Sequence, residues 1–138
     1  MKEKLKTESG FAYLDAVIVM MIVMLVLSII IGVLPVFFQY QDLNYMAHEV
    51  VKTAETEGNI GAKTLERYDE VRSDTGLNPK DISFTGTEKI GATKNVQIND
   101  TIRVTLTSDF VWFSGFLGGG INTELSSTAS GRSGVYYK

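Results

Sequence analysis

The stretch AVIVMMIVMLVLSIIIGVLPVFF, residues 16–38, decides the fold of this chain of 138 residues. It carries no charged side chain, and its only residues of non-hydrophobic type are Ser28, Gly32 and Pro35. A helix of about 23 residues, at ~1.5 Å per residue, covers the ~30 Å hydrocarbon core of a bilayer. Because the run is apolar on every side, it predicts a transmembrane helix rather than one face of a soluble helix.

The flanks of this run predict its orientation. Lysines precede it in the head MKEKLKTESG, and the acids Asp42, Glu49, Glu55 and Glu57 follow it. The excess of Lys and Arg on the cytoplasmic side of membrane helices places the N-terminus in the cytoplasm and the C-terminal part outside the cell membrane. A cleaved secretory signal has a shorter apolar stretch of ~7–15 residues and a small-x-small cut site after it, and this run has neither.

A glycine and an acid mark the entrance to the run. Asp15 directly precedes it, and Gly10 lies five residues earlier. An unpaired carboxylate at this depth costs several kcal/mol in hydrocarbon, so Asp15 calls for a partner. A second interpretation stays open, in which Asp15 only caps the helix N-terminus, where the helix dipole favours an anion.

The segment from Lys2 to Asp15 resembles the leader and first residues of type IV pilins, which a membrane prepilin peptidase cuts after a glycine. Gly10 matches the residue before the cut, Phe11 the new N-terminus and Asp15 the acid at position five. More narrowly, the chain is similar to TadE-type minor pilins, or pseudopilins, of tight-adherence pilus systems. The wider similarity covers residues 38–47 and the late segments 101–108 and 124–132. The usual acid of the family is glutamate, and the leader here also carries Glu3 and Glu8.

This resemblance implies a structural subunit that assembles or primes a type IV (tight-adherence) pilus for adhesion or secretion, in the membrane or in a surface filament. Its partners would be the prepilin peptidase, other pilin subunits, the pilus assembly platform and the membrane. After the cut, the Phe11 ammonium of one subunit would pair with Asp15 of a neighbour, which compensates both charges and sets the assembly register. The alternative is an uncleaved single-pass accessory subunit of a secretion or conjugation apparatus.

The chain divides into a leader (residues 1–10), a long N-terminal helix (11–57) and an extracytoplasmic α+β domain (58–138). Pro35, together with Gly32, predicts a kink late in the apolar run because proline removes a backbone hydrogen bond. Beyond it the helix continues to Glu57, since the next breaker is Gly58. An apolar stripe repeats at three and four residues and predicts packing on a small sheet; it comprises Leu43, Met46, Ala47, Val50, Val51 and Ala54.

The remaining pattern predicts a pilin-like α+β fold, in which the long helix packs on a small antiparallel sheet. A short helix is expected over residues 62–74, with Leu65, Tyr68 and Val71 on one face and Gly76 ending it. Alternating residues then predict four strands, around Ile82–Phe84, Val96–Ile98, Ile102–Leu106 and, at a sheet edge, Thr123–Ser130. Asn99-Asp100 is expected to form a hairpin turn. The tail from Gly131 to Lys138 is expected to be flexible.

The segment SDFVWFSGFLGGG, residues 108–120, holds more apolar residues than an ordinary loop. Two interpretations stay open for Phe110, Trp112, Phe113 and Phe116. They close the small core, or they form an exposed patch that contacts a neighbouring subunit or the membrane interface, where tryptophan is favoured.

Several function classes are disfavoured by composition. The chain has no cysteine, so thiolate metal sites and thiol nucleophiles lack their residues. Its serines and aspartates are scattered, and one histidine makes no case for a catalytic triad. No metal-ligand spacing or phosphate-binding glycine loop is present. The net charge of −3, with +1 in the first ten residues, argues against nucleic acid as a partner. We therefore expect no enzyme activity, no cofactor and no metal.

Overall fold

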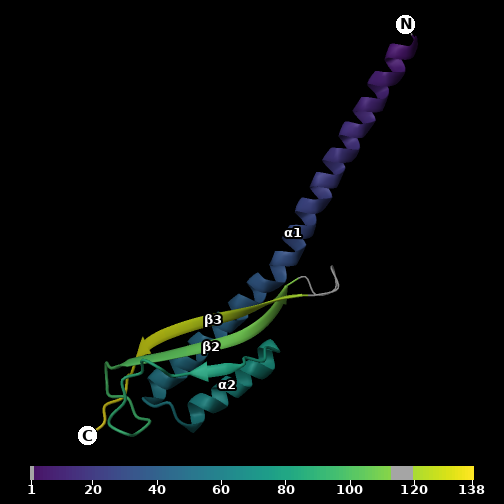
Figure 1. The fold of residues 1–138 in the computed structure, drawn as a ribbon. Coiled ribbons are helices and arrows are strands. Elements are labelled where there is room, and N and C mark those ends of the chain that lie inside the picture. Colours follow the sequence, from purple (N-terminus) through teal and green to yellow (C-terminus); the bar gives the residue numbers. More distant parts are fainter. Residues whose placement is uncertain (1, 113–119) are drawn as a thin grey trace. The chain divides into compact units, whose positions relative to one another are not determined.

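The computed structural model describes residues 2–112 and 120–138, and the chain forms two compact units, one up to Pro35 and one of Val36–Lys138. Two helices precede three strands (Figure 1). They are α1 (Lys2–Glu57), α2 (Ala62–Thr75), β1 (Asp81–Ser83), β2 (Thr101–Trp112) and β3 (Ile121–Arg132). This arrangement confirms the predicted α+β class, with a long apolar N-terminal helix and a small antiparallel sheet.

The sheet has three antiparallel strands in the order β1-β2-β3. β2 is central, and β3 lies at an edge, as expected from its Ser- and Thr-rich sequence. β2 and β3 pair along their whole length, from Thr101 opposite Arg132 to Trp112 opposite Ile121. Ile102, Val104, Leu106 and Ser108 are buried on one face of β2, which is the period of two expected of a half-buried strand.

The strand predicted at Val96–Ile98 is wrong. Val96 is buried, but its N–H donates to the Gly58 carbonyl at 2.7 Å, at the end of α1, instead of joining the sheet. The hairpin predicted at Asn99-Asp100 is wrong for the same reason, because no strand precedes it. The chain turns there, with Asn99 at φ 68°. The Asn99 N–H donates to the Ser133 carbonyl, and the Ser133 N–H donates to the Asp100 carbonyl. The alternation of Val96 and Ile98 therefore resembled a strand because Val96 is buried, although no strand forms there.

The stripe on the second half of α1 is buried as predicted. Its six residues are at most 4% exposed, and most of them belong to one core cluster with residues of α2, β2 and β3. The partners in that cluster are Tyr68, Val71, Val104, Leu106 and Ala129. A smaller cluster forms at the end of α1, where Ala54 meets Ile60, Val96 and Ile102. The core of the Val36–Lys138 unit is thus one helix face covered by α2 and the sheet.

β2 and β3 lie beside the second half of α1 (Figure 1), and three polar contacts fix how the sheet runs along the helix. The Arg132 amide donates to the Glu55 carboxylate at 2.8 Å, and the Ser127 hydroxyl donates to the Asn44 side chain at 3.0 Å. The strand rises about 16 Å from Ser127 to Arg132, and the helix rises about 16 Å from Asn44 to Glu55. In the third contact, Gln39 Nε2 donates to Ser108 Oγ at 3.5 Å. Ser108 pairs with Leu125 of β3, so this contact lies before the Asn44–Ser127 contact along both α1 and β3. β3 therefore runs parallel to α1, and the β2–β3 end near Trp112 points toward Val36.

The second helix begins at Ala62 as predicted and ends one residue later than predicted, at Thr75. Gly76 ends it in the left-handed conformation, at φ 69°, and its N–H donates to the Arg72 carbonyl. Tyr68 and Val71 are buried as expected, but Leu65 is 38% exposed and the prediction for it is wrong. Thr64 takes the inner position instead, with its hydroxyl donating to the Asn59 carbonyl at 2.9 Å. The buried face thus follows residues 64, 68 and 71.

The tail predicted to be flexible is held in place by hydrogen bonds. The buried Ser133 hydroxyl donates to the Val96 carbonyl at 2.8 Å. The Gln97 side chain accepts a hydrogen bond from the Tyr137 backbone N–H at 2.7 Å and donates one to the Tyr137 carbonyl at 2.9 Å. The Tyr137 hydroxyl reaches the Glu57 carbonyl at 3.2 Å. The prediction failed because these partners lie far away in sequence, where local composition carries no information.

Candidate functional site

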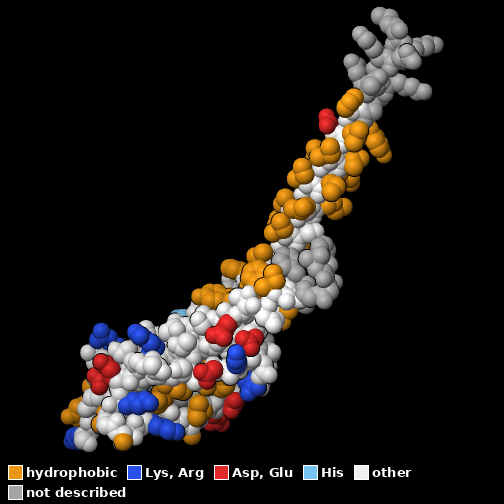
Figure 2. Space-filling view, in the orientation of Figure 1, with side chains coloured by type: hydrophobic (Ala, Val, Ile, Leu, Met, Phe, Trp, Pro, Cys, Tyr) orange, Lys and Arg blue, Asp and Glu red, His pale blue; other side chains and the backbone are white. Residues whose placement is uncertain are grey.

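The first unit, which ends at Pro35, holds most of the apolar run of α1, and the side chains of residues 13–31 are exposed all round the helix. From Val17 to Leu34, the large hydrophobic residues keep between 42% and 72% of their surface exposed. Figure 2 shows these hydrophobic side chains along α1, and Asp15 falls at their N-terminal end in the sequence. Within the described residues, this is one helix long and apolar enough to cross a membrane. It is compatible with a membrane anchor, because water is an unfavourable surrounding for so much apolar surface.

The predicted cleavage site and its acid lie on this helix. Gly10, Phe11 and Asp15 all belong to α1. Phe11 is 67% exposed and Asp15 is exposed. The spacing of four residues places Phe11 and Asp15 on the same helix face, about one turn apart. Among the side chains that the structure describes, Asp15 has no hydrogen-bond or ion-pair partner. A chain cut after Gly10 would therefore carry an ammonium and an unpaired carboxylate on one face.

Gly32 and Pro35 also lie within α1, which continues through both residues. Pro35 has no N–H to donate to the Ile31 carbonyl, so the helix lacks one backbone hydrogen bond there. The two compact units of the chain meet between Pro35 and Val36. The kink at this point stays a prediction.

The aromatic residues predicted as a subunit contact lie at the end of the β2–β3 hairpin. Phe110 and Trp112 stack edge to face, with ring centroids 6.0 Å apart and an interplanar angle of 85°, and both are half-buried. Their neighbours Val111 and Ile121 are 43% and 66% exposed. Phe113 and Phe116 lie outside the described residues. The structure thus brings part of the predicted patch together at one end of the sheet.

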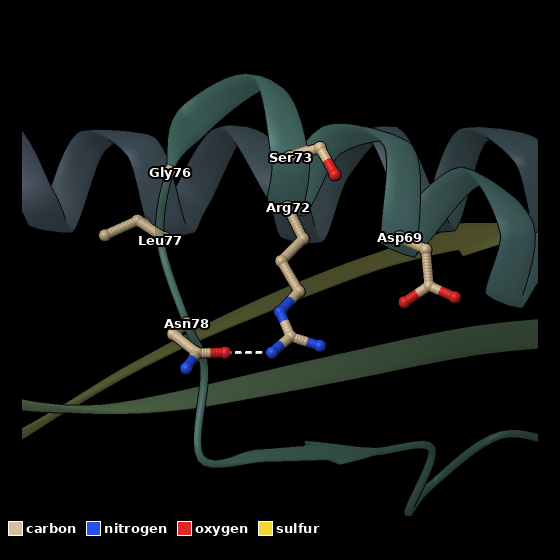
Figure 3. Close-up of a pocket in the computed structure, with 6 residues that line it drawn as sticks. All are labelled: Asp69, Arg72, Ser73, Gly76, Leu77 and Asn78. Atoms are coloured by element: carbon tan, nitrogen blue, oxygen red, sulfur yellow. Dashed lines mark hydrogen bonds between the residues drawn. The ribbon is translucent and has the colours of Figure 1, made fainter.

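An open hollow lies where α2 ends (Figure 3). It is lined by Asp69, Arg72, Ser73, Gly76, Leu77 and Asn78. The Arg72 guanidinium donates to the Asn78 side chain, drawn as a dashed line in Figure 3, and lies in the last turn of α2, where a cation complements the helix dipole. These contacts close the helix end. In residues 2–112 and 120–138, no group of three or more His, Cys, Asp or Glu residues could hold a metal ion.

Two titratable groups of α2, Arg67 and Tyr68, have shifted pKa values. The carboxylates of Glu49 and Glu70 hydrogen-bond Arg67, at 2.7 and 2.9 Å, and raise its pKa further above the ordinary value. Burial raises the pKa of Tyr68, with nearby Asp69 and Asp81 adding to the shift and Arg72 opposing it. Neither group lies in a cleft with a reactive partner, so we assign both side chains a role in the stability of the fold.

Sequence reasoning missed the polar residues that join the sheet to α1. Gln39, Asn44 and Glu55 flank the apolar stripe, and each contacts β2 or β3. Their signal in the sequence is weak, since a polar residue beside a buried stripe is usually solvated. They position the β2–β3 hairpin along the helix and so determine where its aromatic end lies.

One family model matches this chain, over residues 20–138, and its description is "Domain of unknown function (DUF4320)". The match includes most of the apolar run and all of the unit that follows it. No curated protein and no solved structure matches.

Proposed function

This chain belongs to the DUF4320 family, and we propose that it is a minor pilin or pseudopilin precursor that is cut after Gly10. The mature chain would begin at Phe11 and stay in the cell membrane through α1. The Val36–Lys138 unit would lie on the extracytoplasmic side. In this role the protein is a structural subunit that assembles or primes a type IV (tight-adherence) filament, and it has no enzymatic activity of its own.

One observation carries the proposal: a glycine, then an acid five residues later, at the start of an apolar run whose large hydrophobic side chains are exposed from Val17 to Leu34. A plain anchor needs apolar length alone, and the Asp15 carboxylate adds an unfavourable charge to it. A cut after Gly10 creates the missing positive charge at Phe11. The α+β arrangement, with the second half of α1 packed on an antiparallel sheet, further supports a pilin-like subunit.

Assembly follows from these charges. Within one chain, the Phe11 amine and Asp15 lie about one helical turn apart at the membrane boundary. Between two chains side by side, Asp15 of one helix can pair with the Phe11 amine of the other. In low dielectric a paired charge is far less unfavourable than two isolated ones, so the pair favours one register of helix against helix. The apolar side chains of α1 then cover one another in a bundle.

The test is the intact mass of the protein recovered from the membrane and from sheared surface material. We expect a chain that starts at Phe11, with or without a methyl group. The Gly10→Leu variant should keep its leader, whereas the neighbouring Ser9→Ala variant should be processed normally.

A chain that starts at Met1 in both fractions would overturn the proposal. The protein would then be an uncleaved single-pass accessory subunit of a secretion or conjugation apparatus, and its outer unit would be the part that binds a partner. Gly10→Leu would in that case change nothing.

A further inference from the structure

Among the described residues, the end of the β2–β3 hairpin extends beyond the last of the three polar contacts that fix the sheet along α1. That contact joins Gln39 to Ser108. From Ser108 to Trp112 the strand rises about 13 Å, in the direction of Val36. In sequence, Val36 lies at the C-terminal end of the apolar run. The hairpin end therefore extends beyond the level of Gln39, the first polar residue after the apolar run.

The hairpin changes from polar to apolar at nearly the same level as α1. Asp109 faces Glu124 across the strands, and Lys80 lies 3.5 Å and 3.7 Å from their carboxylates. Beyond this charged group, the described residues 110–112 and 120–123 carry no charge. On α1, Phe37 and Phe38 are more than half exposed, and the first charge after them is Asp42. The Gln39–Ser108 contact holds the two boundaries side by side.

We propose that this hairpin end is seated in the headgroup region of the bilayer, beside the point where α1 leaves it. The surface is formed by Phe110, Val111, Trp112 and Ile121, together with Phe37 and Phe38, and its partner is lipid. Aromatic rings, and tryptophan above all, are favoured at the membrane–water interface. The inference rests on the membrane anchoring contained in the proposed function, and it is independent of cleavage after Gly10.

The distribution of exposed residues favours lipid over a second copy of the chain. Trp112 and Ile121 pair on one face of the two-stranded end, and Val111 points from the opposite face. Ile121 is 66% exposed and Val111 is 43% exposed, so apolar surface is open on both faces. A protein partner docked on one face would leave the other in water, whereas lipid surrounds both.

The single tryptophan of the chain makes a direct measurement possible on the unmodified protein. The full chain is placed in vesicles of phosphatidylcholine and phosphatidylglycerol, whose acyl chains are brominated near the headgroup or near the tail. Bromine quenches tryptophan at short range. We expect Trp112 to be quenched strongly by the shallow bromines and weakly by the deep ones, with blue-shifted emission.

Two relocated tryptophans in a Trp112→Phe background calibrate the depth. Val23→Trp should be quenched by the deep bromines, and Tyr136→Trp, at the exposed C-terminal tail, by neither. Ile121→Glu should decrease the quenching of Trp112, and Ile98→Glu, at an isoleucine 48% exposed in a loop, should leave it unchanged.

The outcomes separate the inference from the proposal on which it rests. If Val23→Trp is not quenched, the membrane anchoring itself fails. If Val23→Trp is quenched and Trp112 is not, α1 crosses the bilayer and the lipid contact of the hairpin is overturned. If the emission of Trp112 is blue-shifted only at a high protein-to-lipid ratio, the surface is assigned to a second copy of the chain instead.

Discussion

The Glu55 carboxylate lies directly over Gly131, so close that a β-carbon on residue 131 would overlap with it. The same carboxylate accepts the Arg132 amide at 2.8 Å, and the Glu55 carbonyl accepts the Gly134 amide at 2.9 Å. One residue of α1 thus binds the end of β3 through both its side chain and its backbone. The strand approaches the helix this closely because residue 131 has no side chain.

Gly131→Ala should therefore destabilise the Val36–Lys138 unit. The new methyl group would overlap with Glu55 and would lie 2.9 Å from Cγ1 of buried Val51, and overpacking of this kind costs about 1–3 kcal/mol. Thermal unfolding of the full chain in detergent, followed by circular dichroism, measures the loss. Gly134→Ala is the matched control, because its β-carbon would lie at an ordinary 3.4 Å from the nearest atom. Equal effects of the two variants would contradict the packing argument.

Two glycines in the left-handed conformation, Gly76 and Gly58, should differ in how much their substitution by alanine destabilises the protein. At Gly76, with φ +69°, nothing lies near an added β-carbon, so Gly76→Ala carries only the conformational penalty of about 1 kcal/mol. At Gly58, with φ +65°, the β-carbon would also overlap with Val135. Gly58→Ala should lower the unfolding midpoint clearly further than Gly76→Ala. The reverse order would mean that the tail moves away freely.

Arg67 links α2 to α1 through Glu49, and its removal should have a small, salt-dependent effect. Its side chain is 33% exposed, and ion pairs near the surface contribute only a small amount to stability. Arg67→Gln should destabilise the protein by that small amount at low salt and by less at ~1 M salt, where the charges are screened. Lys63→Gln breaks the more exposed pair with Glu57 and should have a smaller effect. Chemical unfolding at two salt concentrations compares them.

Tyr68 should make the fold less stable at high pH. Burial raises its pKa in the folded chain above the ordinary value, so the unfolded chain binds fewer protons and stability falls as pH rises through that range. The stabilisation is complete below about pH 10 and is lost above it. Tyr68→Phe should lose less of its unfolding free energy than the parent between about pH 9 and 11. Tyr136→Phe, at an exposed tyrosine, should follow the parent curve.

Asp15→Asn should abolish filament assembly and leave membrane insertion intact. The substitution keeps the shape of the side chain and removes the charge that we assign to the Phe11 amine of a neighbour. The amount of protein in sheared surface material, compared with the amount in the membrane fraction, measures the effect. Asp42→Asn removes an acid beyond the apolar run and serves as the control. Normal assembly of the Asp15 variant would disprove the charge pairing.

Local pattern was sufficient for the elements that depend on composition and period. The apolar run needed no tertiary information, because its length and lack of charge are properties of the chain alone. The stripe from Leu43 to Ala54 and the αL end of α2 at Gly76 were predictable on the same ground. Each of these features is set by residues within a few turns of one another.

Contacts between distant segments decided the rest. Val96 is buried because Gly58 and Ser133 bind it, so its apolar character alone predicted a strand wrongly. The tail is ordered through Gln97 and Glu57, which lie 40 and 80 residues away along the chain. The place of the hairpin end depends on Gln39 meeting Ser108 across 69 residues. By itself, the sequence determined an apolar helix that continues into an amphipathic one. Only the tertiary structure decided which polar groups face each other. The reason is that the spacing of apolar residues shows which face of a helix or strand is buried, but not which element packs on that face.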